Sequence, residues 1–482
     1  MATGRDSLYI GGRWAAPSSS TTISVRSAAT GSVIDTVAAA APEDVDRAVS
    51  AARKAFDDPA GWSSWSGDDR AAALERLANA LGARSGEIAR AVSTQNGMPI
   101  TVSEMMEAQF PAAILRYYAG LVTEQDVEPS QPGRFGGTTY CRLEPVGVVA
   151  ALAPWNFPQT LSGAKYAPAL AAGCTVVLKP SPETVLDAAL VAEAAIEAGL
   201  PDGVLNIVPG GVEVGKRLVT HPGVDKVAFT GSTDVGRQIA EACGRLLRPV
   251  TLELGGKSAA IVLDDANLDL EQVGQALFGA MLINNGQTCF LSTRILAPRS
   301  RYTEVIDVIA AMASSSVVGD PLSRDTQIGP LVSSEHRGRV EDFIAKGTSD
   351  GARLVTGGGR PVGMPDGWFL EPTVFADVDN GWSIAREEIF GPVLTITPYD
   401  EVAGAIAIAN DSDYGLAGTV WTSDPDRGLA IARQIRSGSV GINGYMPDLA
   451  APFGGVKSSG IGRELGPAGL ANYQVSKSIY QL

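Results

Sequence analysis

The feature that most restricts the fold of this chain is a repeated alternation between short apolar segments and helical segments, which starts near residue 146. Apolar runs of strand length that alternate with helices are typical of a parallel sheet covered by helices. We predict strands at 146–152, 175–178, 204–208 and 226–229, and helices at 184–198, 213–219 and 235–243. In an open α/β sheet of this kind, ligands bind beyond the carboxyl ends of the strands.

A second α/β unit is predicted to begin near residue 250. We expect its strands at 251–254, 259–263 and 293–297, and its helices at 270–282, 302–313 and 334–346. A chain of 482 residues is too long for one ordinary hydrophobic core, so two or three domains are expected. The predicted fold class is α/β, with two parallel-sheet domains.

The segments outside these two units have different patterns. Residues 8–38 have the short apolar runs and turn residues of a small strand-rich region. Helices are predicted at 43–56, 69–95 and about 105–121, and their apolar residues recur at helical spacing. The polar, Pro- and Gly-rich segment 125–137 is predicted to be a loop or an excursion from the domain, and the tail 475–482 alternates like a strand.

Charge and composition exclude several classes of function. The formal net charge of -15 disfavours binding to nucleic acid or to an anionic membrane. No apolar run reaches the roughly 18 residues of a membrane-spanning helix, and the N-terminus shows no export signal, so we expect a cytoplasmic protein. The cysteines are widely spaced and the histidines are only His221 and His336, so no metal site is predicted.

A carboxylate and a thiol lie in one region of the chain, at Glu253 and Cys289. A carboxylate that deprotonates water and a thiol that holds an acyl group form a two-step covalent catalyst. Gly255 and Gly256 are expected to let backbone or cofactor pass close to Glu253, and Gly286 to leave room around the turn that presents the cysteine.

Six motifs occur in a specific order along the chain. They are Pro154-Trp-Asn-Phe-Pro158, Phe229-Thr-Gly-Ser232, Glu253-Leu-Gly-Gly-Lys257, Gly286-Gln-Thr-Cys289, Glu388-Ile-Phe-Gly-Pro392 and Pro452-Phe-Gly-Gly455. With these motifs the chain resembles the aldehyde dehydrogenase superfamily over nearly its whole length. The resemblance implies a Rossmann-like cofactor domain, a catalytic domain and a small β element for oligomerisation. It implies an enzyme that oxidises an aldehyde to the carboxylic acid with NAD(P).

The resemblance also implies catalytic roles. Cys289 would attack the aldehyde carbon, and the side-chain amide of Asn156 with the Cys289 backbone N–H would stabilise the oxyanion. Glu253 would activate the water that hydrolyses the thioester. Lys165 and Glu464 match a pair that assists proton movement.

The cofactor residues follow from the same resemblance. They are Pro154, Trp155, Lys179, Glu183, Gly211, Gly215, Gly231, Ser232, Leu254, Glu388 and Phe390. This chain departs from the family pattern at Pro182, where many NAD-preferring members carry the glutamate that binds the adenosine ribose. Here the glutamate is the next residue, Glu183. If Glu183 faces the ribose it repels a 2'-phosphate, so NAD is expected, with NADP possible.

The substrate is expected to be an apolar aliphatic or aromatic aldehyde. Ala164 stands where narrow-tunnel members carry a bulky aromatic residue, and Phe157, Leu161, Phe290 and the segment 445–448 are expected to form the pocket walls. The alternatives are a coenzyme A-acylating dehydrogenase, a cysteine hydrolase without a redox step, and a non-catalytic protein of the same fold.

The resemblance divides the chain into three parts. Segments 1–123 and 144–252 would form the dinucleotide-binding domain, and segment 253–455 the catalytic domain. Segments 124–143 and 456–482 would form the oligomerisation element with a bridging segment. A homodimer or homotetramer is expected, because the strand-like tail would offer its edge to another subunit.

Overall fold

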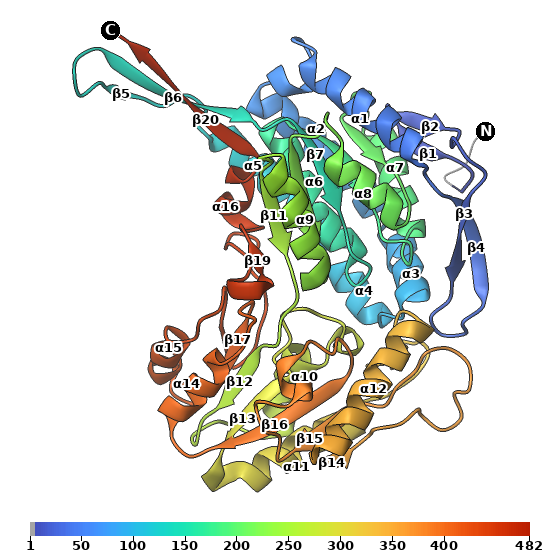
Figure 1. Ribbon diagram of the computed structural model, residues 1–482, viewed down its shortest axis with the longest axis vertical. Helices are drawn as coiled ribbons and strands as arrows, with labels where there is room; N and C mark the ends of the chain where they lie inside the picture. Colours follow the sequence, from blue (N-terminus) through green and yellow to red (C-terminus); the bar gives the residue numbers. More distant parts are fainter. Residues whose placement is uncertain (1–4) are drawn as a thin grey trace.

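The computed structural model describes residues 5–482. The prediction that the N-terminus carries no export signal starts from residues that lie outside this range. Two α/β domains, joined near the end of strand β11, contain the parallel sheets that the sequence predicts (Figure 1).

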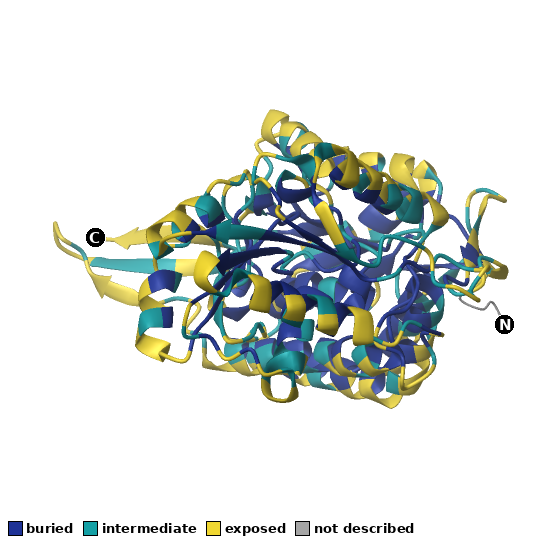
Figure 2. Ribbon diagram, turned by 90° about the horizontal axis from the view of Figure 1, so that it is seen from below, coloured by how far each residue is buried: buried dark blue, intermediate teal, exposed yellow. Residues whose placement is uncertain are grey.

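The sheet of the first domain has the strand order β19-β11-β10-β7-β8-β9-β1-β2. Its central strands are parallel, and they are β7 (Val148–Leu152), β8 (Thr175–Lys179), β9 (Leu205–Ile207), β10 (Lys226–Thr230) and β11 (Val250–Glu253). Antiparallel strands close its edges, namely β1 (Leu8–Ile10), β2 (Arg13–Ala15) and β19 (Gly460–Ile461). The central strands are buried almost throughout, because helices cover both faces of the sheet (Figure 2).

Alternate side chains of β7 enter different cores. Val149 and Ala151 pack with the helices of one face, which are α2 (Gly67–Ala83), α5 (Phe110–Glu124), α6 (Pro158–Ala172) and α7 (Leu186–Glu197). Val148 and Ala150 pack with those of the other face, α1 (Pro42–Asp57), α8 (Val212–Thr220) and α9 (Thr233–Arg245). The two-residue period of a strand therefore distributes one apolar run between two cores.

Two predicted helices are interrupted. The helix predicted at 69–95 is split at Arg84 into α2 and α3 (Ser85–Asn96), although its apolar stripe stays in one core. The helix predicted at about 105–121 is split into α4 (Ile100–Met106) and α5. Pro111 lies in the first turn of α5, where a missing N–H is tolerated, whereas within a longer helix it would remove a hydrogen bond.

The second domain contains a sheet with the order β14-β15-β16-β13-β12-β17-β18. The strands are β12 (Ala259–Val262), β13 (Arg294–Pro298), β14 (Arg353–Thr356), β15 (Thr373–Ala376), β16 (Val393–Tyr399), β17 (Gly418–Trp421) and β18 (Gly441–Ile442). The helices are α10 (Leu270–Met281), α11 (Tyr302–Ser315), α12 (Ser334–Asp350), α13 (Ser383–Arg386), α14 (Val402–Asn410) and α15 (Pro425–Ala432). All neighbouring strands are parallel except the edge pair β14–β15.

One prediction about the second unit is wrong. The strand expected to open that unit, β11, lies in the first sheet, where Glu253 is paired with Thr230 of β10 and with Gly460 of β19. The chain crosses to the second domain only after β11 and enters it at β12. An apolar run is compatible with either sheet, so only strand pairing decides this assignment.

A three-stranded arm extends from the first domain. It consists of β5 (Ser130–Pro132), β6 (Thr138–Pro145) and the C-terminal β20 (Gln474–Gln481), in the order β20-β6-β5. The segment predicted as a loop or excursion thus contains a short strand, and β6 pairs with the tail along its full length. Most of β20 is exposed, and the arm projects beyond the body of the molecule (Figures 1 and 2).

The remaining elements are small. Strands β3 (Thr22–Arg26) and β4 (Val33–Ala38) form a separate hairpin, and the short helix α16 (Gly466–Ala471) precedes β20. No helix within residues 5–482 is long and apolar enough to cross a membrane.

Candidate active site

Cys289 lies between two pockets that open on either side of it. One pocket is lined mainly by apolar side chains. The other runs along the carboxyl ends of the first sheet toward Glu388. A thiol at this position can contact an apolar ligand in the first pocket and a ligand bound along the sheet edge in the second.

The turn before Cys289 has a backbone that few sequences tolerate. Asn284, Asn285 and Gly286 all have positive φ, a conformation that Asn and Gly adopt most readily. The side chain of Asn285 donates to the carbonyls of Gly97 and Pro330, both at 2.9 Å. Any side chain at Gly286 would collide with the carbonyl of Gly391. The turn that presents the cysteine is therefore fixed by contacts with distant segments.

Asn156 lies just before α6 and lines the same pocket as Cys289. It is buried, and its side-chain amide donates one hydrogen bond to the carbonyl of Gln287 at 3.1 Å. An amide nitrogen carries two N–H bonds, so one donor is left for a ligand. The backbone carbonyl of Asn156 accepts from the side chain of Asn284 at 3.0 Å, which holds the loop of Asn156 against the turn before Cys289.

Glu253 ends β11 in a buried environment. Neither of its carboxyl oxygens has a hydrogen-bond partner among the described residues. Burial raises its pKa well above the usual value and the neighbouring Glu464 carboxylate raises it further, whereas Lys165 opposes the shift. Lys165 is also buried, and its Nζ donates to Glu464 at 2.7 Å and to the Thr230 hydroxyl at 2.5 Å. Glu253, Glu464 and Lys165 thus form one buried cluster of ionisable side chains.

The glycines near Glu253 have other neighbours than expected. A side chain at Gly255 would collide with the Glu388 carboxylate, and one at Gly256 would collide with the carbonyl of Cys289. The glycine packed against the Glu253 carboxylate is Gly454. The expectation that the glycine pair makes room beside Glu253 is therefore wrong; it makes room beside Glu388 and Cys289.

A long cleft lies at the carboxyl ends of β7, β8 and β10. Every residue assigned to the cofactor by resemblance lines it, in two adjoining pockets, namely Pro154, Trp155, Lys179, Glu183, Gly211, Gly215, Gly231, Ser232, Leu254, Glu388 and Phe390. Helix α9 begins at this cleft with Ser232 as its N-cap, so its first amides can bind a phosphate group. The donor set and the shape of the cleft fit a dinucleotide.

Two charged residues lie at the far end of the cleft. Burial lowers the pKa of Lys179 to about 8, and the Glu183 carboxylate opposes that shift. The Ser181 hydroxyl donates to the Glu183 carboxylate. Glu183 therefore lines the pocket although Pro182 occupies the usual position of the family glutamate.

Glu388 is held at the other end. Its Oε1 accepts from the backbone N–H of Gly256 at 2.9 Å. Burial raises its pKa to about 7, although that N–H and the Arg339 guanidinium lower it. Arg339 also donates to the Glu388 carbonyl at 2.6 Å, which fixes this loop against α12.

The sequence interpretation missed His336 and Arg339, which line this pocket from α12. The rings of Trp155 and Phe390 each meet the His336 ring in an edge-on arrangement. His336 Nε2 donates to the carbonyl of Phe390 at 2.6 Å, and burial lowers its pKa to about 4. No motif surrounds His336 in the sequence. It reaches this pocket only because α12 of the second domain packs beside it.

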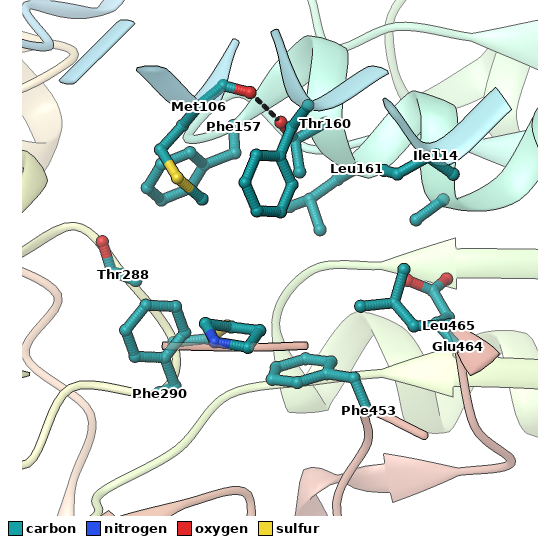
Figure 3. A pocket seen from close by; sticks show the side chains of 14 residues that line it. Met106, Ile114, Phe157, Thr160, Leu161, Thr288, Phe290, Phe453, Glu464 and Leu465 are labelled. Carbon is teal, nitrogen blue, oxygen red and sulfur yellow. Dashed lines mark hydrogen bonds between the residues drawn. The ribbon is translucent and has the colours of Figure 1, made fainter. Parts of the chain in front are cut away.

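The apolar pocket has two opposing walls (Figure 3). The predicted wall residues Phe157, Leu161 and Phe290 line it, as does the small Ala164, and the predicted segment 445–448 contributes Pro447. The sequence interpretation missed Met106, Phe110, Ile114, Phe453 and Leu465, which also line it. Met106, Phe110 and Ile114 have the helical spacing of core residues, and Phe453 and Leu465 lie in a Gly-rich region. Neither pattern distinguishes a residue that lines a pocket from one that packs in the core.

The model of the aldehyde dehydrogenase family matches residues 14–479. The chain belongs to this family. The geranial dehydrogenase of Castellaniella defragrans is 55% identical over 482 residues, 100% of each chain. An aldehyde dehydrogenase of Mycobacterium tuberculosis complexed with NAD+ has a TM-score of 0.96 and 48% identity, covering 100% of this chain and 99% of that one. Aldehyde dehydrogenase C of Pseudomonas syringae, a mutant complexed with NAD+ and octanal, has a TM-score of 0.95 and 41% identity, covering 99% and 97%.

This aldehyde dehydrogenase is an NAD-dependent oxidoreductase that converts an aldehyde to the carboxylic acid. The predicted family and fold class are confirmed. The coenzyme A-acylating alternative finds no support in these relatives. Within residues 5–482, no group of three or more His, Cys, Asp or Glu side chains is arranged to hold a metal ion.

The acidity of the Cys289 thiol in this aldehyde dehydrogenase is testable. Burial raises the pKa of Cys289 well above its usual value, and the carboxylates of Glu388 and Glu253 raise it further. Below the pKa, the thiolate fraction grows about tenfold for each unit of pH. We expect alkylation of Cys289 by iodoacetamide, without cofactor, to accelerate steadily between pH 7 and 9. Glu388→Gln removes one negative neighbour, so alkylation should be faster at each pH; a rate independent of pH would contradict the assignment.

Proposed function

We propose that this enzyme oxidises apolar aldehydes, and that the sulfur of Cys289 forms the covalent bond to the substrate. The observation that carries the proposal is the position of Cys289 between an apolar pocket and the cleft with dinucleotide-binding features. In this proposal the thiolate attacks the aldehyde carbon to form a thiohemiacetal. The free N–H of the Asn156 amide and the backbone N–H of Cys289 stabilise the oxyanion.

Bound NAD supplies the acceptor for the hydride that leaves the substrate carbon. In the second half of the reaction Glu253 takes a proton from water, which attacks the carbonyl carbon of the thioester. The carbon–sulfur bond breaks, the carboxylic acid leaves and the thiolate of Cys289 is restored. A high pKa suits Glu253 as a base, because it accepts a proton readily once ionised. We propose that Glu464 and Lys165, which are bonded to each other, pass this proton onward.

The substrate class follows from the walls of the pocket. Its lining is largely aromatic and aliphatic, and Glu464 is the one charged side chain among the described residues that line it. Each buried methylene group contributes roughly 0.8 kcal/mol to binding, so longer apolar aldehydes gain most. The similarity to a geranial dehydrogenase supports an apolar aldehyde as the substrate.

A panel of aldehydes tests the substrate class. With NAD in excess we expect kcat/KM for geranial or octanal to exceed that for the cationic betaine aldehyde by about 100-fold. NADH formation should be independent of added coenzyme A. Equal efficiency for the charged and apolar aldehydes would refute the apolar assignment, and a requirement for coenzyme A would refute hydrolysis.

We further propose that Glu183 favours NAD over NADP. A carboxylate in the part of the cleft near Lys179 would repel a 2'-phosphate. Glu183→Gln should raise kcat/KM for NADP about tenfold, relative to NAD, because it removes this repulsion. The matched control is Glu304→Gln, an exposed residue of α11 paired with Arg301 outside the cleft. A ratio of NADP to NAD efficiency that stays the same in both variants would remove Glu183 from this role.

The domain division also stays a proposal. We propose that segments 1–123 and 144–252 bind the dinucleotide and that segment 253–455 is catalytic. Segments 124–143 and 456–482 would form the contact between subunits of a homodimer or homotetramer. The exposed apolar side chains of β20 support this role, and they are Val475, Ile479 and Tyr480. Sedimentation analysis of the intact enzyme tests the subunit number. The cytoplasmic location stays a prediction.

A further inference from the structure

One wall of the aldehyde pocket is built from two elements that are distant in sequence. Met106 ends α4, whereas Phe157, Thr160 and Leu161 belong to the start of α6, and Figure 3 shows them together on the same side of the pocket. The shape of this wall therefore depends on how the end of α4 is held against the first turn of α6.

A buried carboxylate lies between these two elements. Glu107 follows Met106 directly and is 0% exposed. Its Oε2 accepts from the backbone N–H of Gln159 at 2.7 Å, and its Oε1 accepts from the backbone N–H of Thr160 at 3.3 Å. Both amides belong to the first turn of α6, where backbone donors have no partner within the helix.

A second contact joins the same elements in the opposite direction. The Thr160 hydroxyl donates to the backbone carbonyl of Met106 at 2.5 Å (Figure 3). The side chain of Gln159 points elsewhere, and its amide donates to the carboxylate of Asp187 at 2.7 Å. Three hydrogen bonds between neighbouring residues thus connect the end of α4 to the start of α6.

The burial of Glu107 needs an explanation. No ion pair to Glu107 occurs among the described residues, so its carboxyl group is buried without a cationic partner, which is unfavourable. Burial raises its pKa to about 8, and the N–H donors of Gln159 and Thr160 oppose the shift. An apolar residue would avoid that cost but would leave both amides unpaired.

We propose that Glu107 is a positioning residue, which holds the first turn of α6 against α4 and so sets the width of the aldehyde pocket and the place of Asn156. Asn156 lies two residues before the first residue of α6, so movement of this turn moves the oxyanion donor. The inference rests on the proposed apolar-aldehyde pocket. It concerns substrate geometry, because Glu107 itself does not line the cofactor cleft and this turn reaches that cleft through Asn156.

The test compares Glu107→Gln with Glu104→Gln in the intact enzyme. Glutamine has nearly the same shape but carries one acceptor oxygen, so it can pair with only one of the two backbone N–H groups of α6. Glu104 lies on α4 three residues earlier and pairs with Arg324 at the surface, so the control makes the same chemical change away from α6. In Glu107→Gln we expect the KM for octanal to rise about tenfold and the KM for NAD to stay within about twofold. The control should match the wild type.

Two kinetic results would overturn the inference. They are an unchanged KM for octanal in Glu107→Gln, or an equal rise in both KM values, which would indicate general destabilisation. Oxidation of octanal by the wild type is measured in parallel. A wild type that is inactive on apolar aldehydes would refute the proposed function, and the inference that rests on it would fall with it. An active wild type with an unchanged Glu107→Gln variant would refute the inference alone.

Hydrogen exchange in the wild type keeps the inference testable if Glu107→Gln does not fold. We expect the amides of Gln159 and Thr160 to exchange slowly in the NAD-bound enzyme, although first-turn amides without a partner normally exchange fast. Mass spectrometry with overlapping peptides across 156–165 resolves them. Complete exchange within seconds would show that the carboxylate does not hold this turn.

Discussion

Cys289→Ala should abolish NADH formation from every aldehyde, with a fall in kcat of at least about 10⁴-fold. Alanine removes the atom that bonds to the substrate carbon, and no other described thiol lines either pocket beside it. Binding of NAD should persist, because the cleft is otherwise intact. The measurement is absorbance of NADH under saturating substrate, together with quenching of protein fluorescence by the cofactor.

Cys141→Ala provides the matched control. Cys141 lies on β6 of the arm and lines neither pocket, and it is also a free and partly exposed thiol. This variant should retain wild-type activity. Substantial turnover by Cys289→Ala would show that the aldehyde is oxidised without a covalent bond to this sulfur.

Glu253→Gln should separate the two halves of the reaction. Glutamine is nearly isosteric but cannot accept a proton from water, so the thioester should accumulate. We expect a burst of about one NADH per active site, followed by steady turnover slower by about 10²–10⁴-fold. Rapid mixing with detection of NADH measures both phases, and mass spectrometry of the quenched enzyme detects the acyl group on Cys289.

Glu241→Gln on the exposed face of α9 is the control for the second variant. It should give wild-type steady-state rates. If Glu253→Gln turns over normally and shows no burst, another group activates the water, and the buried Glu464 is then the next candidate.

Much of the site could be read from the sequence because its chemistry is concentrated in short motifs. A motif such as Pro154-Trp-Asn-Phe-Pro158 specifies both a strand-end turn and the amide proposed to stabilise the oxyanion, so its position and its chemistry are predicted together. The turn before Cys289 is also local: Gly286 was predicted to leave room there, and the structure shows that Asn284 and Asn285 have positive φ as well. Each of these predictions depends on residues that are adjacent in the chain.

Contacts between distant segments were decided only by the tertiary structure. The assignment of β11 to the first sheet, the packing of Gly255 on Glu388 and the entry of His336 into the cofactor cleft each join residues more than 15 positions apart. The bonds from Glu107 to α6 belong to the same class. Local pattern determined the strands, the helices and the reactive groups, because backbone preference and side-chain chemistry act over a few residues. Which groups meet was determined by packing of the two sheets, because burial and hydrogen bonding depend on neighbours in space.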